Sequence, residues 1–274
     1  MADAAYRFVN AVGRAALRGL RVDVRWTGAE HLPHTGPALL AATHVAFPDF
    51  LFVERAAVTR GRLVRFLTRH DVWDVPGAGW WMDRMGHVPV DRHVPAHAYV
   101  RARALLRSGE AVCGFPEAGI SHSYTVRPLM RGLVALARET GVPVVPVGVW
   151  GTQRFLSVGD PAPPPDWSRG RRVDLAFGAP IAVAPGDDLT ARTHDLGHAL
   201  TGLLEGLQTL PHHRPDPGVP AVWHPHHLGG DAPTRQRAVH LDEVPFAAVR
   251  PSWGPDLDAY DVPAATTPPG PPAR

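Results

Sequence analysis

The sequence contains no lysine, so all 28 of its cationic side chains are arginine. Against 26 acidic residues they leave a formal net charge of +2, which is too balanced to indicate a nucleic-acid-binding protein. Because Cys113 is the only cysteine, an internal disulfide bond and a zinc site built from several cysteines are both excluded. Nothing in the composition calls for an oxidising compartment, and we expect a cytoplasmic protein.

Long apolar segments are also missing. No run approaches the roughly 18 apolar residues of a membrane-spanning helix, and the N-terminus lacks an apolar signal core followed by a cleavage site of small residues. We therefore expect a chain that neither crosses a membrane nor is exported. Hydrophobic side chains make up 45% of the 274 residues, enough to bury the core of one large domain or two small ones. A disordered or fibrous protein is excluded.

β-like runs alternate with helix-like runs over residues 1–210, which we interpret as the main domain, with a motif-bearing core at about 37–150. This alternation predicts an α/β fold with a mostly parallel central sheet covered by helices on both faces. In such folds ligands bind beyond the carboxyl ends of the strands. The predicted strands are Arg21–Trp26, Pro37–Thr43, Leu63–Thr68, His87–Val90, Ala111–Phe115, Pro143–Val149 and Arg172–Phe177.

Residues 211–274 differ from the rest because they hold 14 of the 30 prolines and 6 of the 16 histidines. Such proline density prevents long helices and central strands. We interpret this segment as a C-terminal extension that is either disordered or packed on the domain as an extended strap. His224, His226 and His227, together with His212 and His213, leave a metal-binding appendage open as an alternative. The side chains that could anchor a strap are Trp223, Leu228, Phe246 and Trp253.

Residues 4–20 have the pattern of a basic amphipathic helix. Tyr6, Val9 and Leu17 lie on its apolar face, and arginines lie on another face. One interpretation is a helix packed on the sheet; the other is a helix lying on an anionic lipid surface, and different turns could do both. Trp80 and Trp81 likewise fit either the core or a membrane-facing lip beside an acyl-chain groove.

The first segment that could carry chemistry runs from Thr43 to Asp49, directly after an apolar strand. His44 would lie at the carboxyl end of that strand, and Pro48 suits the first turn of a following helix. The intervening loop can then bring the carboxylate of Asp49 beside the imidazole. A carboxylate on one ring nitrogen fixes the tautomer and leaves the other nitrogen as a base, so the pair predicts general-base chemistry. The spacing by itself also fits a purely structural pair.

Two further segments end predicted strands at the same edge of the sheet. Arg92 follows the strand His87–Val90, and its guanidinium suits phosphate recognition because it can donate to two oxygens at once. Glu117 and Gly119 follow the strand Ala111–Phe115. The carboxylate could accept hydrogen bonds from a polyol, and the glycine allows close approach of the backbone to a ligand. Each segment alone also fits an ordinary strand-to-loop turn.

The order of these segments resembles the glycerolipid acyltransferase family, which acylates lysophosphatidate and related acceptors. The family's first motif, a His followed by four residues and an Asp, matches His44 and Asp49. Its second motif, a Gly followed by a short apolar strand and Val-Asp-Arg, matches Gly86 and Val90-Asp91-Arg92.

The resemblance continues over about residues 20–205. The family's third motif, Phe-Pro-Glu-Gly-Thr-Arg-Ser, is matched in part by Phe115-Pro116-Glu117 and by Ser121. Its fourth motif, an apolar strand that contains a proline, is matched around Pro146. The ordered set of four motifs is more specific than any one of them.

The sequence departs from the family pattern in the third motif, where Ala118-Gly119-Ile120 stands in place of Gly-Thr-Arg. The resemblance implies that the family's Arg helps to hold the phosphate of the acceptor, which Ile120 cannot do. Arg127 or Arg131 could supply the charge instead, because residues 128–132 resemble the family's Pro-Phe-Lys-x-Gly. The alternative is an acceptor other than lysophosphatidate. Thr43 stands where the family usually has Asn.

The resemblance implies an O-acyltransferase of phospholipid biosynthesis or remodelling that needs no cofactor and no metal. His44 would take the proton from a hydroxyl of a lysophospholipid or related glycerolipid as that hydroxyl attacks an acyl thioester, and Asp49 would orient the ring. Coenzyme A or acyl carrier protein would carry the thioester, and an anionic membrane surface would hold the acceptor. We therefore expect a peripheral protein on the inner face of the cell membrane. The residues expected to bind substrate are Arg92, Glu117, Gly119 and Arg131.

Three other interpretations stay open. A covalent acyl-enzyme could form on Ser121 or Cys113, although neither lies in a Gly-x-Ser-x-Gly turn. Water activated by His44 could hydrolyse the thioester, which would make the protein an acyl-thioester hydrolase. The N-terminal helix could instead serve a non-enzymatic protein that binds lipid or membranes.

Overall fold

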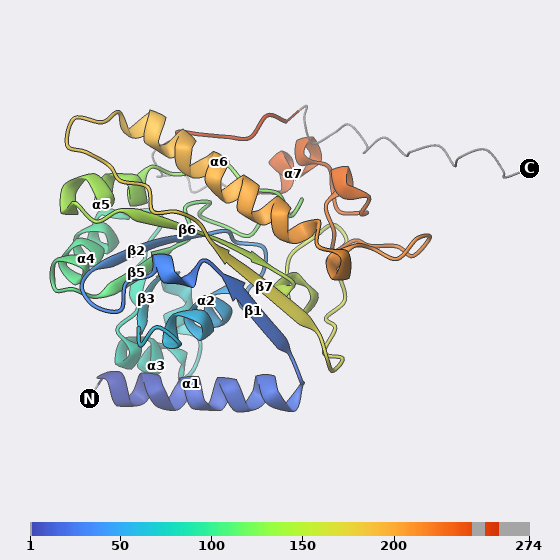
Figure 1. Cartoon of the computed structure of the whole chain (residues 1–274), viewed down its shortest axis with the longest axis horizontal. Coiled ribbons are helices and arrows are strands. Elements are labelled where there is room, and N and C mark those ends of the chain that lie inside the picture. The colour runs from blue at the N-terminus through green and yellow to red at the C-terminus, as the bar shows by residue number, and fades with distance from the viewer. Residues whose placement is uncertain (1, 243–249, 258–274) are drawn as a thin grey trace, which may run out of the picture.

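The computed structural model describes residues 2–242 and 250–257, and Figure 1 shows a central sheet with helices on both of its faces. The seven strands lie in the order β1-β7-β6-β2-β5-β3-β4. They coincide with the seven predicted strands to within a few residues, which confirms the α/β prediction. Their bounds are β1 (Asp23–Thr27), β2 (Ala38–Ala42), β3 (Val64–Arg69), β4 (Val88–Val90), β5 (Ala111–Gly114), β6 (Val144–Trp150) and β7 (Arg172–Phe177).

The sheet is mostly parallel, as predicted, with one antiparallel junction. β2 pairs in parallel with both β5 and β6, and β3 pairs in parallel with β4 and β5. β7 runs antiparallel to β6 and parallel to β1. The connection from β6 to β7 holds only the short 3-10 helix η3 (Thr152–Arg154), and without a crossover helix the chain returns alongside β6 in the opposite direction.

Seven α-helices surround the sheet in the described residues. α1 to α3 lie on one side of it and α4 to α6 on the other (Figure 1). The two faces of β2 show how one strand serves both layers, because Leu39 and Ala41 pack with α4, α5 and α6 while Leu40 packs with α2. The bounds are α1 (Ala2–Gly19), α2 (Asp49–Val58), α3 (Ala78–Met85), α4 (Ala96–Arg107), α5 (Gly132–Thr140), α6 (Leu189–Gln208) and α7 (Arg235–Leu241).

The inner face of α1 is fixed to the domain by polar contacts. The Tyr6 hydroxyl donates to the carbonyl oxygen of Val64 at 2.6 Å, and the Asn10 amide donates to Glu54 at 2.8 Å. The outer face leaves Phe8 and Val12 exposed. Helix α1 is therefore packed on the domain, and it also presents apolar side chains outward. No helix among the described residues is long and apolar enough to cross a membrane.

The described part of the extension, residues 211–242 and 250–257, packs on the domain; we call it the C-terminal segment. Trp253 is buried in the core beside α6, and the main chains of Leu129 and Trp253 pair as an isolated bridge. Trp223 also packs against this core. These contacts are those of a strap, although the domain boundary at residue 210 stays a prediction. Phe246, expected to anchor the strap, lies outside the described residues.

Candidate active site

Strand β2 delivers the first motif to the carboxyl edge of the sheet. It ends at Ala42, and the next residue, Thr43, ties the loop to β6: its N–H donates to the carbonyl oxygen of Val147 at 2.9 Å, and its hydroxyl accepts from the N–H of Val149 at 3.0 Å. Thr43 is fully buried. The position of His44 is thus set by two hydrogen bonds from its neighbour.

His44 and Asp49 are in contact, as the spacing predicts. The Nδ1 atom of His44 lies 2.9 Å from Oδ2 of Asp49. The same oxygen accepts hydrogen bonds from the N–H groups of Val45 and Ala46, at 2.8 and 2.9 Å. The Asp49 side chain is 0% exposed and the His44 side chain 19% exposed. With Nδ1–H directed at the carboxylate, Nε2 is the nitrogen that can take up a proton.

Thr152 holds the second oxygen of Asp49. Its hydroxyl donates to Oδ1, and both residues are fully buried. Thr152 begins η3, immediately after the end of β6. The sequence analysis did not identify Thr152. It could have done so, because Thr152 directly follows the strand predicted in the fourth motif, at the edge of the sheet where ligands are expected. Asp49 therefore receives four hydrogen bonds, which fix its orientation toward the imidazole.

The third motif packs directly on the first. The Phe115 ring stacks on the His44 ring, with 4.2 Å between centroids and 25° between planes. The N–H of Ser121 donates to the carbonyl oxygen of His44 at 3.1 Å. The imidazole is thus held on one face by an aromatic ring and on one edge by a carboxylate, which restricts its rotation.

Glu117 connects the loop that carries His44 to the loop that carries Arg127. One of its oxygens accepts from the N–H of His44 and the other from the N–H of Arg127, both at 2.8 Å. The residue is 3% exposed, and burial raises its pKa to about 8 against the opposing hydrogen bonds from Arg127 and His44. Because main-chain donors occupy both oxygens, this position does not favour the predicted hydrogen bond to a substrate hydroxyl. Glu117 instead orders the loop that carries His44.

Gly119 packs closely against the guanidinium of Arg127. A Cβ atom at Gly119 would lie 2.3 Å from Nη1 of Arg127, and that nitrogen donates to the carbonyl oxygen of Ile120 at 3.1 Å. The preceding residue, Ala118, has a φ of 55°, in the left-handed region that favours glycine. The residues that depart from the family motif, Ala118, Gly119 and Ile120, therefore pack together with one later residue. Arg127 is buried beside them, and Ile120 is buried as well.

The C-terminal segment contributes a buried carboxylate to this region. Asp242 pairs with Arg127 at 3.4 Å, with Arg235 at 2.7 Å and with Nδ1 of His122 at 2.9 Å. Its side chain is 4% exposed. Asp242 and Arg235 were missed at the sequence level, because nothing in the proline-rich extension indicates which residues reach the third motif.

The other two predicted binding residues lie further out. Arg92 follows β4, which is three strands away from β2, a lateral distance of roughly 14 Å. Its charge still reaches the third motif, because the pKa of Arg127 is lowered by burial and further by the charges of Arg235 and Arg92. Arg131 is exposed at the start of α5. Their roles in binding stay predictions.

Neither candidate nucleophile has the environment of one. Ser121 is fully buried, and its hydroxyl lies 3.2 Å from that of Ser123. Cys113 is buried within β5, and burial raises the pKa of its thiol far above the usual range. Neither environment favours a covalent acyl-enzyme.

Comparison with known proteins gives a consistent result. Residues 23–150 match the family model described as Acyltransferase. The chain is 30% identical over 136 residues to the 1-acyl-sn-glycerol-3-phosphate acyltransferase BAT2, chloroplastic, of Brassica napus, covering 48% of this chain and 38% of that one. It is 31% identical over 144 residues to 1-acyl-sn-glycerol-3-phosphate acyltransferase alpha of Homo sapiens, covering 51% and 49%. The chain thus spans about half or less of these relatives.

A solved structure shares the fold. The crystal structure of the 1-acyl-sn-glycerophosphate (LPA) acyltransferase PlsC from Thermotoga maritima aligns with a TM-score of 0.58 at 22% sequence identity. The alignment covers 75% of this chain and 81% of that chain. It supports the sheet and helix arrangement described above.

Proposed function

We propose that this chain is a glycerolipid acyltransferase, which transfers a fatty acyl group from an acyl thioester to a hydroxyl of lysophosphatidate or a related lysolipid; the match of residues 23–150 to the acyltransferase family model supports this. The observation that carries the proposal is the contact between His44 and Asp49 at the carboxyl end of β2. It supplies a base whose tautomer and orientation are fixed before substrate binds.

In the proposed reaction Nε2 of His44 takes the proton from the acceptor hydroxyl while the hydroxyl oxygen bonds to the thioester carbonyl carbon. Asp49 stabilises the imidazolium that results. When the tetrahedral intermediate collapses, the carbon–sulfur bond breaks and the departing thiolate takes the proton from His44. No cofactor and no covalent enzyme intermediate is needed, and coenzyme A or acyl carrier protein serves as the carrier of the donor.

The charges around the third motif support an anionic acceptor. The charges of Arg235 and Arg92 both act on Arg127, so several arginine charges lie near this motif. We assign the head group of the acceptor to Arg92, since Arg127 is buried. Ile120 then needs no direct contact with phosphate.

The N-terminal helix supports a membrane-bound acceptor. Phe8 on α1 stacks on Trp81 at 5.9 Å between centroids, and the exposed Trp80 lies beside it under the guanidinium of Arg84. Apolar rings with an adjacent cation suit the boundary between lipid head groups and acyl chains. Peripheral attachment to an anionic membrane, on its cytoplasmic inner face, is therefore part of the proposal.

The experiment is a two-substrate assay with the full chain. Thiol release from acyl-coenzyme A is measured with lysophosphatidate, with a neutral monoacylglycerol and without acceptor, and the lipid products are identified by mass spectrometry. We expect thiol release that depends on lysophosphatidate and yields phosphatidate. Equal thiol release without acceptor would instead identify a hydrolase, and preference for the neutral acceptor would overturn the assignment of the head group to Arg92.

A further inference from the structure

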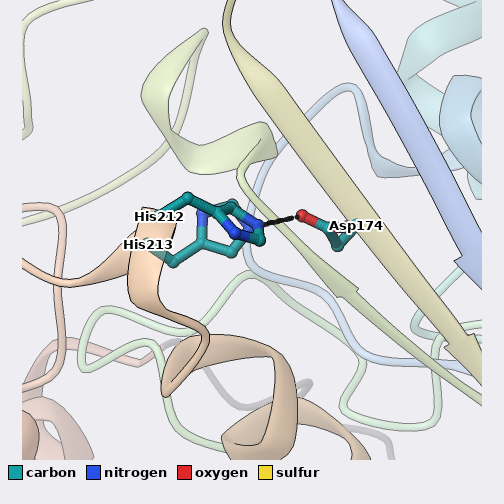
Figure 2. Close-up of side chains that lie close together, drawn as sticks. All are labelled: Asp174, His212 and His213. Atoms are coloured by element: carbon teal, nitrogen blue, oxygen red, sulfur yellow. Dashed lines mark hydrogen bonds and ion pairs between the residues drawn. The ribbon is translucent and has the colours of Figure 1, made fainter.

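Two neighbouring histidines and one aspartate lie together near the edge of the sheet formed by β1 and β7, at the opposite edge from β4. Figure 2 shows the rings of His212 and His213 turned toward the carboxylate of Asp174. The Nε2 atoms of the two rings lie 2.7 and 2.8 Å from Oδ2 of Asp174. The histidines belong to the 3-10 helix η4 (Pro211–His213), at the start of the C-terminal segment, and Asp174 belongs to β7.

The three ligand atoms have the chemistry of a zinc site. They all lie within 4.8 Å of one another. Two imidazole nitrogens and one carboxylate oxygen form a common set of protein ligands for Zn²⁺, which leaves a fourth position for water or another ligand. Ligand atoms around a tetrahedral Zn²⁺ lie roughly 3.3 Å apart, so each nitrogen would move away from Oδ2 by about half an ångström, and the two nitrogens would take up the same spacing.

Three of the four arginines beside the site pair with carboxylates other than Asp174. A cavity of about 370 Å³ adjoins His212 and His213 and is also lined by four arginines, Arg154, Arg169, Arg171 and Arg172. Arg172 pairs with Asp23, and both Arg154 and Arg171 pair with Asp166. None of these three ion pairs involves Asp174, and the cavity gives access to the fourth position.

We propose that Asp174, His212 and His213 bind one Zn²⁺ ion, which ties the start of the C-terminal segment to the sheet. The ion would take no part in acyl transfer. By fixing the His213 ring, the ion would also hold the chain just after β6 in place. The backbone of Gly151 packs against this ring, since a Cβ atom on Gly151 would lie 3.2 Å from Cε1 of His213. The next residue is Thr152, which holds Asp49.

The first test measures metal binding by the wild-type full chain. The protein is stripped with a chelator, exchanged against Zn²⁺ and dialysed, and its metal content is determined by mass spectrometry. We expect one Zn²⁺ ion per chain. Substitution by Co²⁺ should give the intense visible absorption of a tetrahedral site. If the stripped wild-type protein retains no Zn²⁺ and gives no such absorption, the proposal is wrong.

The second test locates the ion with Asp174→Asn and His212→Ala. Asn keeps the size of the side chain, and His212 is the more exposed of the two histidines, so both variants should fold, which circular dichroism would check. We expect Zn²⁺ affinity to fall at least ~100-fold in each. The matched control is His194→Ala with His198→Ala, two exposed histidines one turn apart on α6.

The control decides between two locations. Loss of Zn²⁺ in the α6 variant with full retention in Asp174→Asn would overturn the proposal, since the ion would then bind to the helix surface. Thermal unfolding gives an independent readout, because a ligand that binds only the folded state raises the melting temperature. Zn²⁺ should raise it for the wild type and the α6 variant but not for Asp174→Asn.

Discussion

The hydroxyl of Thr152 donates a hydrogen bond to Oδ1 of Asp49 across 103 positions of sequence. The candidate base of the site, His44, touches the other oxygen of the same carboxylate. The first motif is therefore complete only when the end of β6 lies beside the end of β2, and the parallel pairing of these strands ensures that it does.

Replacement of Thr152 by Val should slow the reaction without unfolding the protein. The change leaves Oδ1 of Asp49 without this donor, and a lost hydrogen bond to a buried charge is worth about 1–2 kcal/mol, or roughly 5- to 30-fold in kcat. Steady-state thiol release measures the effect. The control is Thr193→Val in α6, whose hydroxyl also bonds within a buried environment but far from the site. Equal losses in both variants would contradict the role of Thr152.

His44→Ala should remove general-base catalysis, with kcat falling by about 10² to 10⁴-fold. The fold should persist, because the ring stays partly exposed and packs mainly on Phe115. His97→Ala, at an exposed position of α4, serves as the matched control and should keep wild-type activity. Acyl transfer near the wild-type rate in His44→Ala would remove the basis of the proposed mechanism.

Asp242→Ala should destabilise the protein by about 3–5 kcal/mol, because it leaves the buried charges of Arg127 and Arg235 without their carboxylate. Chemical unfolding monitored by circular dichroism measures the loss. Asp160→Ala breaks an exposed pair between the domain and Arg237 of α7, and it should cost less than about 1 kcal/mol. Similar losses of unfolding free energy in the two variants would contradict the prediction that the buried Asp242 pairs stabilise the protein more than an exposed pair does.

Ala118→Gly should stabilise the protein by about 1 kcal/mol, because the residue has a φ of 55° and glycine adopts that conformation without strain. Thermal unfolding measures the gain. The same substitution at Ala104, an exposed position within α4, should have the opposite sign and cost about 0.5–1 kcal/mol. A loss at both positions would show that the left-handed conformation carries no strain.

Glu54 should make the protein less stable as the pH rises. Burial raises its pKa from 4.5 to about 7, so the folded state binds the proton more tightly than the unfolded state does. The stability contributed by protonated Glu54 is complete below about pH 4.5 and is lost as the pH rises to about 7. The difference amounts to roughly 3 kcal/mol.

Unfolding free energies measured from pH 5 to pH 8 test this prediction. Glu54→Gln should remove the contribution of Glu54 to the loss of stability over that range, while Glu30→Gln, at an exposed position, should leave the curve unchanged. The slope that remains in Glu54→Gln belongs to other buried groups, such as Glu117, whose pKa is raised to about 8, and His87, whose pKa is lowered to about 4. An unchanged slope in Glu54→Gln would contradict the assignment.

Much of the fold could be predicted from local pattern. Each strand is a short apolar run bounded by turn residues, so the seven runs were recognisable one at a time. The antiparallel junction between β6 and β7 was not, because the direction of a strand depends on how the intervening chain returns to the sheet. The sequence also suggested that the backbone at Gly119 can approach another group closely. That group is the buried guanidinium of Arg127, which belongs to a later loop and could not be identified from the motif itself.

The contact between His44 and Asp49 follows from the local sequence. The two residues are only five positions apart, and the short turn between them ends at the first residue of a helix, which keeps the two side chains close together. The tertiary structure decided what surrounds them. Thr152, Glu117 and Asp242 reach this region from η3 after β6, from the third motif and from the C-terminal segment. Contacts between residues so far apart follow from strand order and from the path of the returning chain, and neither is encoded in the few residues around any one motif.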